Sequence, residues 1–359
     1  MSADVASEQE AFSGTREVEA RHRFDAEAFA AWAAREIEGF AGPLELRQFK
    51  GGQSNPTYEV ITPGRRYVLR RKPPGKLLPS AHAVDREFRV IAALHPTGFP
   101  VAKPYALCLD ETVIGTAFYV MEKVEGRILW DGRLPGMSPP ERRAVYEAEI
   151  TTLARLHLLD PVALGLSDFG KAGNYFARQV DRWTKQYRAS ETDPLEPMDR
   201  LIAFLPATIP ADDQTGIVHG DYRLDNMILA PDRAEVRAVL DWELSTLGNP
   251  LADFSYFLMN WVMPAEQRGG LAGLDLAETG IPSIEEAVAL YCSLTGRDGL
   301  PALDWYFAYN LFRLAAILQG IAGRVRDGTA SSPHAMAMIA RIRPLAEAAW
   351  GFAERAGAE

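Results

Sequence analysis

The sequence has few of the features that secreted, membrane-spanning or nucleic-acid-binding proteins depend on. Only two of its 359 residues are cysteines, Cys108 and Cys292, which stand 184 positions apart and outside any metal-binding spacing. A disulfide framework and a cysteine-based zinc site are therefore not expected, and a reducing cytoplasm fits best. The first residues have no basic start and no apolar core, so we expect no signal peptide.

Long apolar runs and excess positive charge are also missing. No uncharged apolar run reaches the roughly 18 residues that a membrane-spanning helix needs. Lysine and arginine total 38 against 48 aspartates and glutamates, a net charge of −10. We therefore expect neither nucleic acid nor an anionic membrane surface as a partner. What is present, 47% hydrophobic and 24% charged residues, indicates a globular chain of about two domains.

The first third of the chain alternates short strands with helices. Residues 1–20 are polar and acidic, which indicates a flexible tail, and Asp25 then has the position of an N-cap for an amphipathic helix. Runs rich in strand-forming residues, separated by glycine-rich and Pro-Gly turns, predict three neighbouring antiparallel strands at 44–50, 57–62 and 66–70. We expect a helix over about 81–94 and a strand pair ending at 117–124 to complete this part.

Beyond Gly126 the pattern is mostly helical. The clearest helices are expected at about 139–158, 174–187, 283–295, 303–325 and 334–355. Two strand-like stretches with polar loops, residues 217–229 and 236–244, interrupt them. After the tail we therefore predict a β-rich lobe at 21–122, a hinge connector at 123–126 and a larger helical lobe at 127–359. A site is expected in the crevice between such lobes.

Acidic and amide side chains accompany the short strands of the helical lobe. Asp221 and Asn226 lie five positions apart in a loop, and Asp241 directly follows the apolar run 238–240. Carboxylate and amide oxygens suit Mg²⁺. A carboxylate left free of the metal, such as Asp221, could accept a proton from a substrate hydroxyl. The alternative is that these residues only form turns and helix caps, as most loop aspartates do.

Two patterns in the β-rich lobe suggest a site for phosphate. The segment Gly-Gly-Gln-Ser-Asn at 51–55 would let backbone N–H groups approach an anion, although it also suits an ordinary hairpin turn. Arg70 ends a strand whose alternation puts it on the same face as Val68, and Glu87 follows seventeen residues later in a helix. A strand cation paired with a helix carboxylate would meet phosphate, whereas the alternative is a charged face in water.

Together these motifs resemble the aminoglycoside phosphotransferase family, the small-molecule branch of the protein-kinase-like fold. The order is the same: glycine-rich loop, strand cation, helix glutamate, connector, the motif HGDYRLDN at 219–226 and the run LDWE at 240–243. The resemblance covers about residues 24–350. The segments GGQSNPTYEV, YVLRRKPPG and LDWELSTLGNPLADF are similar to the kinase subgroup also found fused to acyl-CoA dehydrogenases. Since the chain shows no flavin-binding segment, we expect no dehydrogenase activity from it.

The resemblance implies a bilobal α+β fold, with an antiparallel β-sheet and a helix in the N-terminal lobe and a mostly helical C-terminal lobe. It also implies an enzyme that moves the γ-phosphoryl group of ATP, with Mg²⁺, to a hydroxyl of a small molecule. Asp221 would be the catalytic base and Arg223 would reach the transferred group. Asn226 and Asp241 would bind the metal, and Glu243 would support a metal-bound water or a second ion. The nucleotide would be held by Gly52, Ser54, Asn55, Arg70, Glu87, Met121, Glu122 and Val124.

One position departs from the family pattern, because related kinases usually have lysine where this chain has Arg70. Arginine is permanently charged and can still pair with Glu87 and phosphate, but it is not isosteric with lysine. Three nearby polar residues are interpreted as structural. Asp253 would tie the catalytic loop to the following helix, and His219 and His157 would pack and form hydrogen bonds.

The acceptor is the part of the prediction that the sequence constrains least. Residues 255–330 contain no acidic cluster of the kind that binds polycationic sugars, and the helix around 305–321 is apolar on nearly all sides. Such a helix is most often buried core. Alternatively, it lines an apolar cleft with two aromatic helices, where Arg313 or Arg324 meets an anionic group, and the subgroup resemblance then suggests a hydroxyacyl-CoA.

Two rival functions stay open at this point. One is a nucleotide-binding pseudokinase without turnover, and the other is a kinase of aminoglycosides or other small alcohols. The sequence also leaves open the choice between ATP and GTP, the oligomeric state and whether the cleft is open without ligand.

Overall fold

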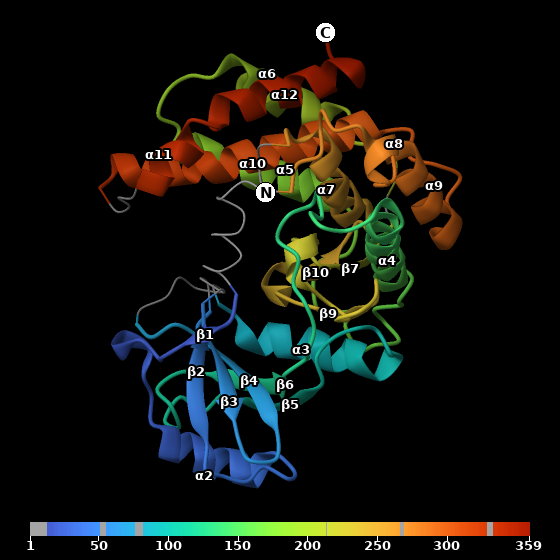
Figure 1. The fold of residues 1–359 in the computed structure, drawn as a ribbon. Helices are drawn as coiled ribbons and strands as arrows, with labels where there is room; N and C mark the ends of the chain where they lie inside the picture. Colours follow the sequence, from blue (N-terminus) through green and yellow to red (C-terminus); the bar gives the residue numbers. More distant parts are fainter. Residues whose placement is uncertain (1–12, 51–54, 76–81, 213, 266–268, 329–332) are drawn as a thin grey trace.

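The computed structural model describes residues 13–50, 55–75, 82–212, 214–265, 269–328 and 333–359. Within these residues the chain folds into an N-terminal sheet lobe and a larger helical lobe that contains the C-terminus (Figure 1). The predicted bilobal α+β arrangement is therefore confirmed. Gly52 and Ser54, two of the expected phosphate-binding residues, lie outside the described residues.

An antiparallel sheet of six strands dominates the N-terminal lobe. Its order is β1-β2-β3-β4-β6-β5, and its strands are β1 (Thr15–Arg16), β2 (Glu45–Phe49), β3 (Thr57–Ile61), β4 (Arg66–Arg71), β5 (Pro104–Cys108) and β6 (Phe118–Glu122). The three neighbouring strands predicted between residues 44 and 70 are confirmed. The prediction of a flexible tail is wrong for residues 15 and 16, which pair with β2. An edge strand offers unpaired backbone groups that such a segment can satisfy.

One helix packs on each face of this sheet. α2 (Ala26–Glu36) covers the outer face and α3 (Val84–Leu94) lies on the inner face, toward the helical lobe (Figure 1). Asp25 caps α2 as predicted, because its side chain accepts hydrogen bonds from the first backbone N–H groups of the helix. Two 3-10 turns, Ala20–His22 and His95–Thr97, flank these helices in the chain.

The alternation predicted for β4 sorts its charged side chains. Tyr67 and Leu69 enter the core shared with α2, and Arg71 on the same face donates a hydrogen bond to Thr116. Arg70 lies on the opposite face, toward the helical lobe. Arg70 is therefore the cation that this strand offers to an interlobe site.

The second lobe is built from helices around two short strand pairs. Its helices are α4 (Pro139–His157), α5 (Tyr175–Ser190), α6 (Glu196–Ala207), α7 (Leu251–Val262), α8 (Leu276–Thr279), α9 (Ile284–Thr295), α10 (Leu303–Arg326), α11 (Pro333–Ile339) and α12 (Ile342–Arg355). Strand β7 (Gly216–Val218) pairs with β10 (Thr246–Gly248), and β8 (Met227–Leu229) pairs with β9 (Val236–Val239). The segments between these strands carry the predicted motifs, with 3-10 turns at Leu224–Asn226 and Trp242–Leu244.

The helical lobe differs from the sequence-based expectation at two places. α6 is not among the predicted helices, although Met198, Leu201 and Leu205 are buried at helical spacing. The single helix expected over 334–355 is divided into α11 and α12. Pro344 explains the division, because a proline fits the first turn of a helix but clashes with the preceding turn inside one.

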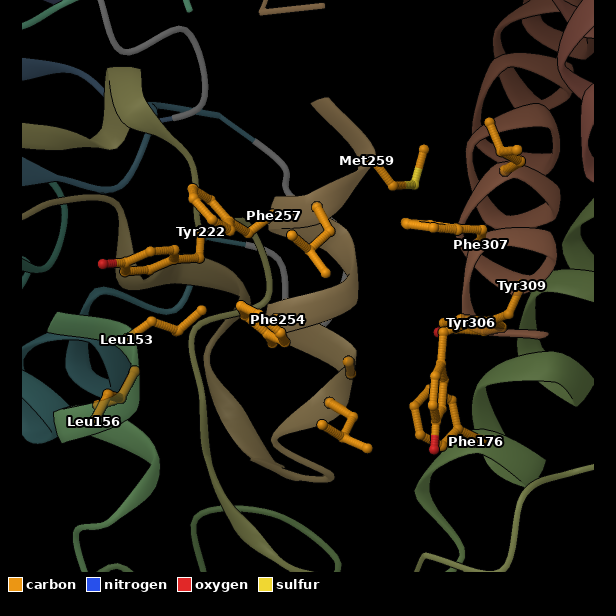
Figure 2. Packing of buried hydrophobic residues seen from close by; sticks show 14 of the residues in the cluster. Leu153, Leu156, Phe176, Tyr222, Phe254, Phe257, Met259, Tyr306, Phe307 and Tyr309 are labelled. Atoms are coloured by element: carbon orange, nitrogen blue, oxygen red, sulfur yellow. The ribbon is translucent and has the colours of Figure 1, made fainter. Parts of the chain in front are cut away.

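Aromatic side chains fill the centre of the helical lobe. α10 packs against α5, α7 and α12. Figure 2 shows Phe176 of α5 against Tyr306 and Tyr309 of α10, and Tyr222 and Phe257 in the adjoining part of the core. The interpretation of residues 305–321 as buried core is confirmed for 305–312. We find no helix in the described ranges with the length and apolar character of a membrane span.

Candidate active site

A cavity of about 460 Å³ lies between the two lobes. Side chains of β3, β4, β6 and the connector line it from one side, and the segments before β8 and after β9 line it from the other. The structure brings six of the predicted site residues to this cavity: Arg70, Met121, Glu122, Val124, Asn226 and Asp241. Residues predicted from both lobes and from the connector therefore meet in one place.

Arg70 is the centre of a buried group of charges. Its Nε lies 2.8 Å from Glu87 Oε2, as the sequence predicts for the strand cation and the helix carboxylate. Its Nη2 lies 2.7 Å from Asp241 Oδ1 and 3.5 Å from Glu243 Oε2. Burial by itself would lower the pKa of Arg70, but the surrounding carboxylates outweigh it and raise the pKa above its ordinary value. Arg70 is therefore held as a cation that joins the two lobes.

Glu87 is fixed by two neutral donors in addition to Arg70. Tyr119 Oη donates to Glu87 Oε2 at 3.0 Å, and Asn55 Nδ2 donates to Oε1 at 2.8 Å. Burial raises the pKa of Glu87, against the lowering effect of Arg70. The side chain of Asn55 is fully buried and also contacts His82, so it is engaged with Glu87 rather than lining the cavity.

The segment after β7 is anchored by its backbone to α7. Asp253 Oδ2 accepts a hydrogen bond from His219 N at 2.5 Å, and Asp253 Oδ1 accepts one from Gly220 N at 2.8 Å. His219 is buried, with Nε2 2.8 Å from Leu240 O. Gly220 has φ +88°, and a Cβ there would lie 2.8 Å from Leu244 O, so glycine is required. The structural roles predicted for Asp253 and His219 are confirmed.

Asp221, the predicted base, has both carboxylate oxygens in contact with side chains. Asn226 Nδ2 donates to Oδ2 at 3.1 Å and to the Asp221 carbonyl at 2.9 Å. Tyr256 Oη donates to Oδ1 at 3.0 Å, and Arg223 Nε lies 3.3 Å from the same oxygen. Tyr256 was missed by the sequence analysis. Its only signal is the spacing of three residues from Asp253, which puts both on one face of α7.

Asn226, Asp241 and Glu243 offer the oxygen ligands predicted for a metal. Because Asn226 Nδ2 is used by Asp221, the amide oxygen is the atom left for a cation. Asp241 has φ +62°, a left-handed conformation that aspartate adopts more readily than most residues. Two carboxylates and an amide fit Mg²⁺, which keeps waters and substrate phosphates among its ligands. The described residues contain no cluster of three or more His, Cys, Asp or Glu side chains suited to a metal ion.

Arg313 of α10 reaches the same segment from the helical lobe. Its Nη2 donates to the carbonyl of Gly220 at 3.0 Å. The guanidinium lies 5.2 Å from the ring centre of Tyr256 and 5.8 Å from that of Trp183. Arg324, the other candidate for an anionic group, is exposed and eleven residues further along α10. Of the two arginines expected to meet an anionic group, Arg313 is therefore the one that contacts the Asp221 segment.

Similar proteins are found among both curated sequences and solved structures. Acyl-CoA dehydrogenase family member 10 of Mus musculus is 47% identical over 318 residues, which cover 88% of this chain and 30% of that protein. Acyl-CoA dehydrogenase family member 11 of Homo sapiens is 41% identical over 349 residues, 96% of this chain and 45% of that protein. The chain therefore spans less than half the length of these curated relatives.

Among solved structures, one from Ralstonia eutropha assigned to the aminoglycoside phosphotransferases is 52% identical. It has a TM-score of 0.87 and covers 93% of this chain and 99% of its own. Macrolide 2'-phosphotransferase MphH of Brachybacterium faecium is 18% identical with a TM-score of 0.57 over 89% of this chain and 98% of its own, a likeness of fold alone. The sequence also matches the phosphotransferase enzyme family, APH, over residues 45–287. Since this match covers well over half of the 359 residues and includes parts of both lobes, the chain belongs to the phosphotransferase enzyme family.

Proposed function

We propose that this protein is an ATP- and Mg²⁺-dependent phosphotransferase that moves the γ-phosphoryl group to a hydroxyl of a small molecule. The observation that carries the proposal is the meeting of Arg70, Asn226 and Asp241 at one cavity, with Asp221 hydrogen-bonded to Asn226. Family membership supports the coarser statement, a small-molecule kinase. In this proposal 21–122 is the nucleotide-binding lobe, 123–126 the hinge connector and 127–359 the lobe with the catalytic, metal and substrate groups.

The helical lobe supplies the chemistry of transfer. Asp221 accepts the proton of the acceptor hydroxyl or orients that hydroxyl toward the phosphoryl group. Arg223, whose Nε is 3.3 Å from Asp221, offsets charge on the transferred group. Asn226 and Asp241 hold Mg²⁺, with Glu243 supporting a bound water or a second ion. Mg²⁺ held by these residues would supply positive charge that offsets the negative charge developing on the phosphates during transfer.

The sheet lobe and the connector supply the nucleotide site. Backbone groups of Glu122 and Val124 bind adenine, Met121 lines the pocket, and the loop with Gly52 and Ser54 covers the phosphates. Aminoglycoside phosphotransferase APH(4)-Ia, which shares the fold at 14% identity and a TM-score of 0.59, was solved with ADP and hygromycin B. That complex supports ATP as the phosphoryl donor in this chain.

The rival interpretation, a nucleotide-binding pseudokinase, rests on Arg70 standing where related kinases have lysine. The contacts of Arg70 support a working site instead. Arg70 lies 2.8 Å from Glu87 and 2.7 Å from Asp241, so the arginine forms the ion pair between strand and helix and also meets the proposed metal ligand. A binding module would also need no ordered carboxylate at Asp221.

For the acceptor we propose a hydroxyacyl-CoA. The curated relatives carry the name acyl-CoA dehydrogenase, although the chain spans less than half of their length. Arg313 supports an acceptor with an anionic or carbonyl group, since it lies between two aromatic rings and next to the Asp221 segment. An aminoglycoside is the second candidate, because the Ralstonia structure at 52% identity is assigned to that class.

A direct test is ATP consumption with Mg²⁺ against 4-hydroxyacyl-CoAs, kanamycin, choline and sugars, with the Asp221→Ala variant as control. Turnover with a 4-hydroxyacyl-CoA that the variant loses would support both the reaction and the acceptor. Turnover with kanamycin alone would refute a hydroxyacyl-CoA as the acceptor but would still support phosphoryl transfer from ATP. Nucleotide binding without turnover of any acceptor would favour the pseudokinase.

A further inference from the structure

The catalytic segment is held from a single face of α7. Asp253 accepts hydrogen bonds from the N–H groups of His219 and Gly220, and Tyr256, one helical turn later, donates to the carboxylate of Asp221. Three consecutive residues of the segment are thus bound by two side chains of one rigid helix. The first two contacts fix the backbone, whereas the Tyr256 contact fixes the direction of a side chain.

Tyr256 and Arg223 both lie close to the same oxygen, Asp221 Oδ1. Arg223 Nε is 3.3 Å from Asp221 Oδ1, without the alignment of a hydrogen bond. Arg223 Nη2 is 3.4 Å from Asp225 Oδ2. A small rotation of the Asp221 carboxylate would therefore convert this loose contact into a close ion pair with the guanidinium. Such a pair would leave the carboxylate less free to accept a proton.

Tyr256 is itself held in a fixed position and in its donor form. Arg313 lies 5.2 Å from its ring centre and donates to the carbonyl of Gly220. The adjacent Ser255 is fully buried and accepts a hydrogen bond from Asn310 of α10 at 2.9 Å. Burial, followed by the charge of Asp221, raises the pKa of Tyr256 well above its ordinary value, so the phenol stays protonated.

We infer that Tyr256 is a positioning residue, which aims the carboxylate of Asp221 at the acceptor hydroxyl and keeps it from closing onto Arg223. The inference rests on the proposed phosphotransferase function. Tyr256 acts through Asp221 and takes no proton in the reaction. Tyr256 lies outside the motif HGDYRLDN, so the motif by itself does not reveal that α7 contacts the base.

The test compares Tyr256→Phe with Tyr58→Phe, using Mg²⁺, ATP and a 4-hydroxyacyl-CoA as the probe. Tyr58 of β3 is a matched control because its side chain is fully buried and its hydroxyl donates to the carbonyl of His22 at 2.7 Å, within the sheet lobe and away from Asp221. We expect Tyr256→Phe to lower kcat about tenfold, the size of one hydrogen bond to a charged group, with an unchanged KM for ATP. Tyr58→Phe should leave kcat unchanged.

A double-mutant cycle separates positioning from general stability. In an Asp221→Asn background, adding Tyr256→Phe should change kcat by less than about twofold, because the carboxylate that it positions is gone. A second loss of about tenfold in that background would overturn the inference, since the two residues would then act independently.

Crystal structures of the wild type and Tyr256→Phe give a readout that needs no acceptor. The variant should show the Asp221 carboxylate rotated into a close pair with Arg223. An Asp221 side chain that keeps its wild-type position in the variant would overturn the inference even if the acceptor were wrongly identified. Absence of turnover in the wild type with every acceptor would instead count against the proposed function.

Discussion

The two groups of side chains that meet at the interlobe cavity are held in different ways. On the sheet side, Arg70 is buried among the carboxylates of Glu87, Asp241 and Glu243. On the helical side, the hydrogen bonds to the Asp221 carboxylate come from the neutral donors Asn226 and Tyr256. The first group depends on charge balance, so removing one member leaves the others unpaired. The second depends on direction, so its loss should affect rate more than stability.

The largest effect is expected from the directional group. Asp221→Asn keeps the shape of the side chain but removes the proton acceptor, so we expect kcat to fall about 10³-fold. The midpoint of thermal unfolding should stay within about 2 °C, because Asp221 is only partly buried. Steady-state kinetics and thermal denaturation of the same preparation measure the loss of kcat and the change in unfolding midpoint. A variant that keeps its rate would remove Asp221 from the mechanism.

The charge-balanced group should respond mainly in stability. Arg70→Met leaves Glu87 buried without its cation, and we expect it to lower the free energy of unfolding by about 3 kcal/mol and to weaken ATP binding. Arg71→Met is the matched control, since Arg71 is also buried, lies on the opposite face of the strand and donates a hydrogen bond to Thr116. We expect it to cost about 1 kcal/mol or less. Equal losses in urea denaturation would show that burial, not the ion pairs, decides the effect.

A smaller effect, one that depends on pH, is expected at a buried carboxyl group outside both of these groups. Glu149 of α4 is fully buried, neither carboxylate oxygen has a hydrogen-bond partner among the described residues, and its carbonyl accepts from Tyr222. Burial, with a smaller contribution from Asp225, raises the pKa of Glu149 well above its ordinary value. The folded state therefore binds a proton that the unfolded state releases, and stability is lost as pH rises above the unfolded pKa of about 4.3.

Glu149→Gln should remove this dependence. Relative to the wild type, the variant should gain up to about 1.4 kcal/mol in unfolding free energy per pH unit above pH 5. Glu147→Gln is the control, because Glu147 is only partly buried on the same helix and pairs with Arg143. Urea denaturation at pH 5, 6, 7 and 8 measures the slopes. If the unfolding free energies of the wild type and Glu149→Gln change with pH in parallel, Glu149 does not bind an extra proton in the folded state.

The sequence predicted the site best where chemistry and local pattern coincide. Strand alternation put Arg70 on the face opposite Tyr67 and Leu69, and the resemblance implied its pairing with Glu87, which is found. Asp253 was predicted to connect the catalytic loop to the following helix, and its carboxylate does accept hydrogen bonds from two backbone N–H groups of that loop. Asn55 was expected at phosphate, yet its side chain is buried against Glu87 and His82, because loop sequence does not specify where a side chain turns.

Contacts between distant elements were beyond the sequence. Tyr256 and Arg313 contact the Asp221 segment only because α7 and α10 pack beside it. Each residue lies in an aromatic helix whose sequence is typical of buried core. The same holds for Tyr119, whose hydroxyl reaches Glu87 across the inner face of the sheet. The division between α11 and α12 was readable in principle, since Pro344 marks it.

The central claim is that the cavity transfers a phosphoryl group from ATP to a hydroxyl, and ³¹P NMR tests it most directly. The enzyme would be incubated with Mg²⁺, ATP and the acceptor identified by the panel, and the spectrum followed with time. We predict that ADP and a phosphate monoester of the acceptor appear together in equal amounts, and that both form about 10³-fold more slowly with Asp221→Asn. Release of ADP with inorganic phosphate alone, and no phosphorylated acceptor, would contradict the account.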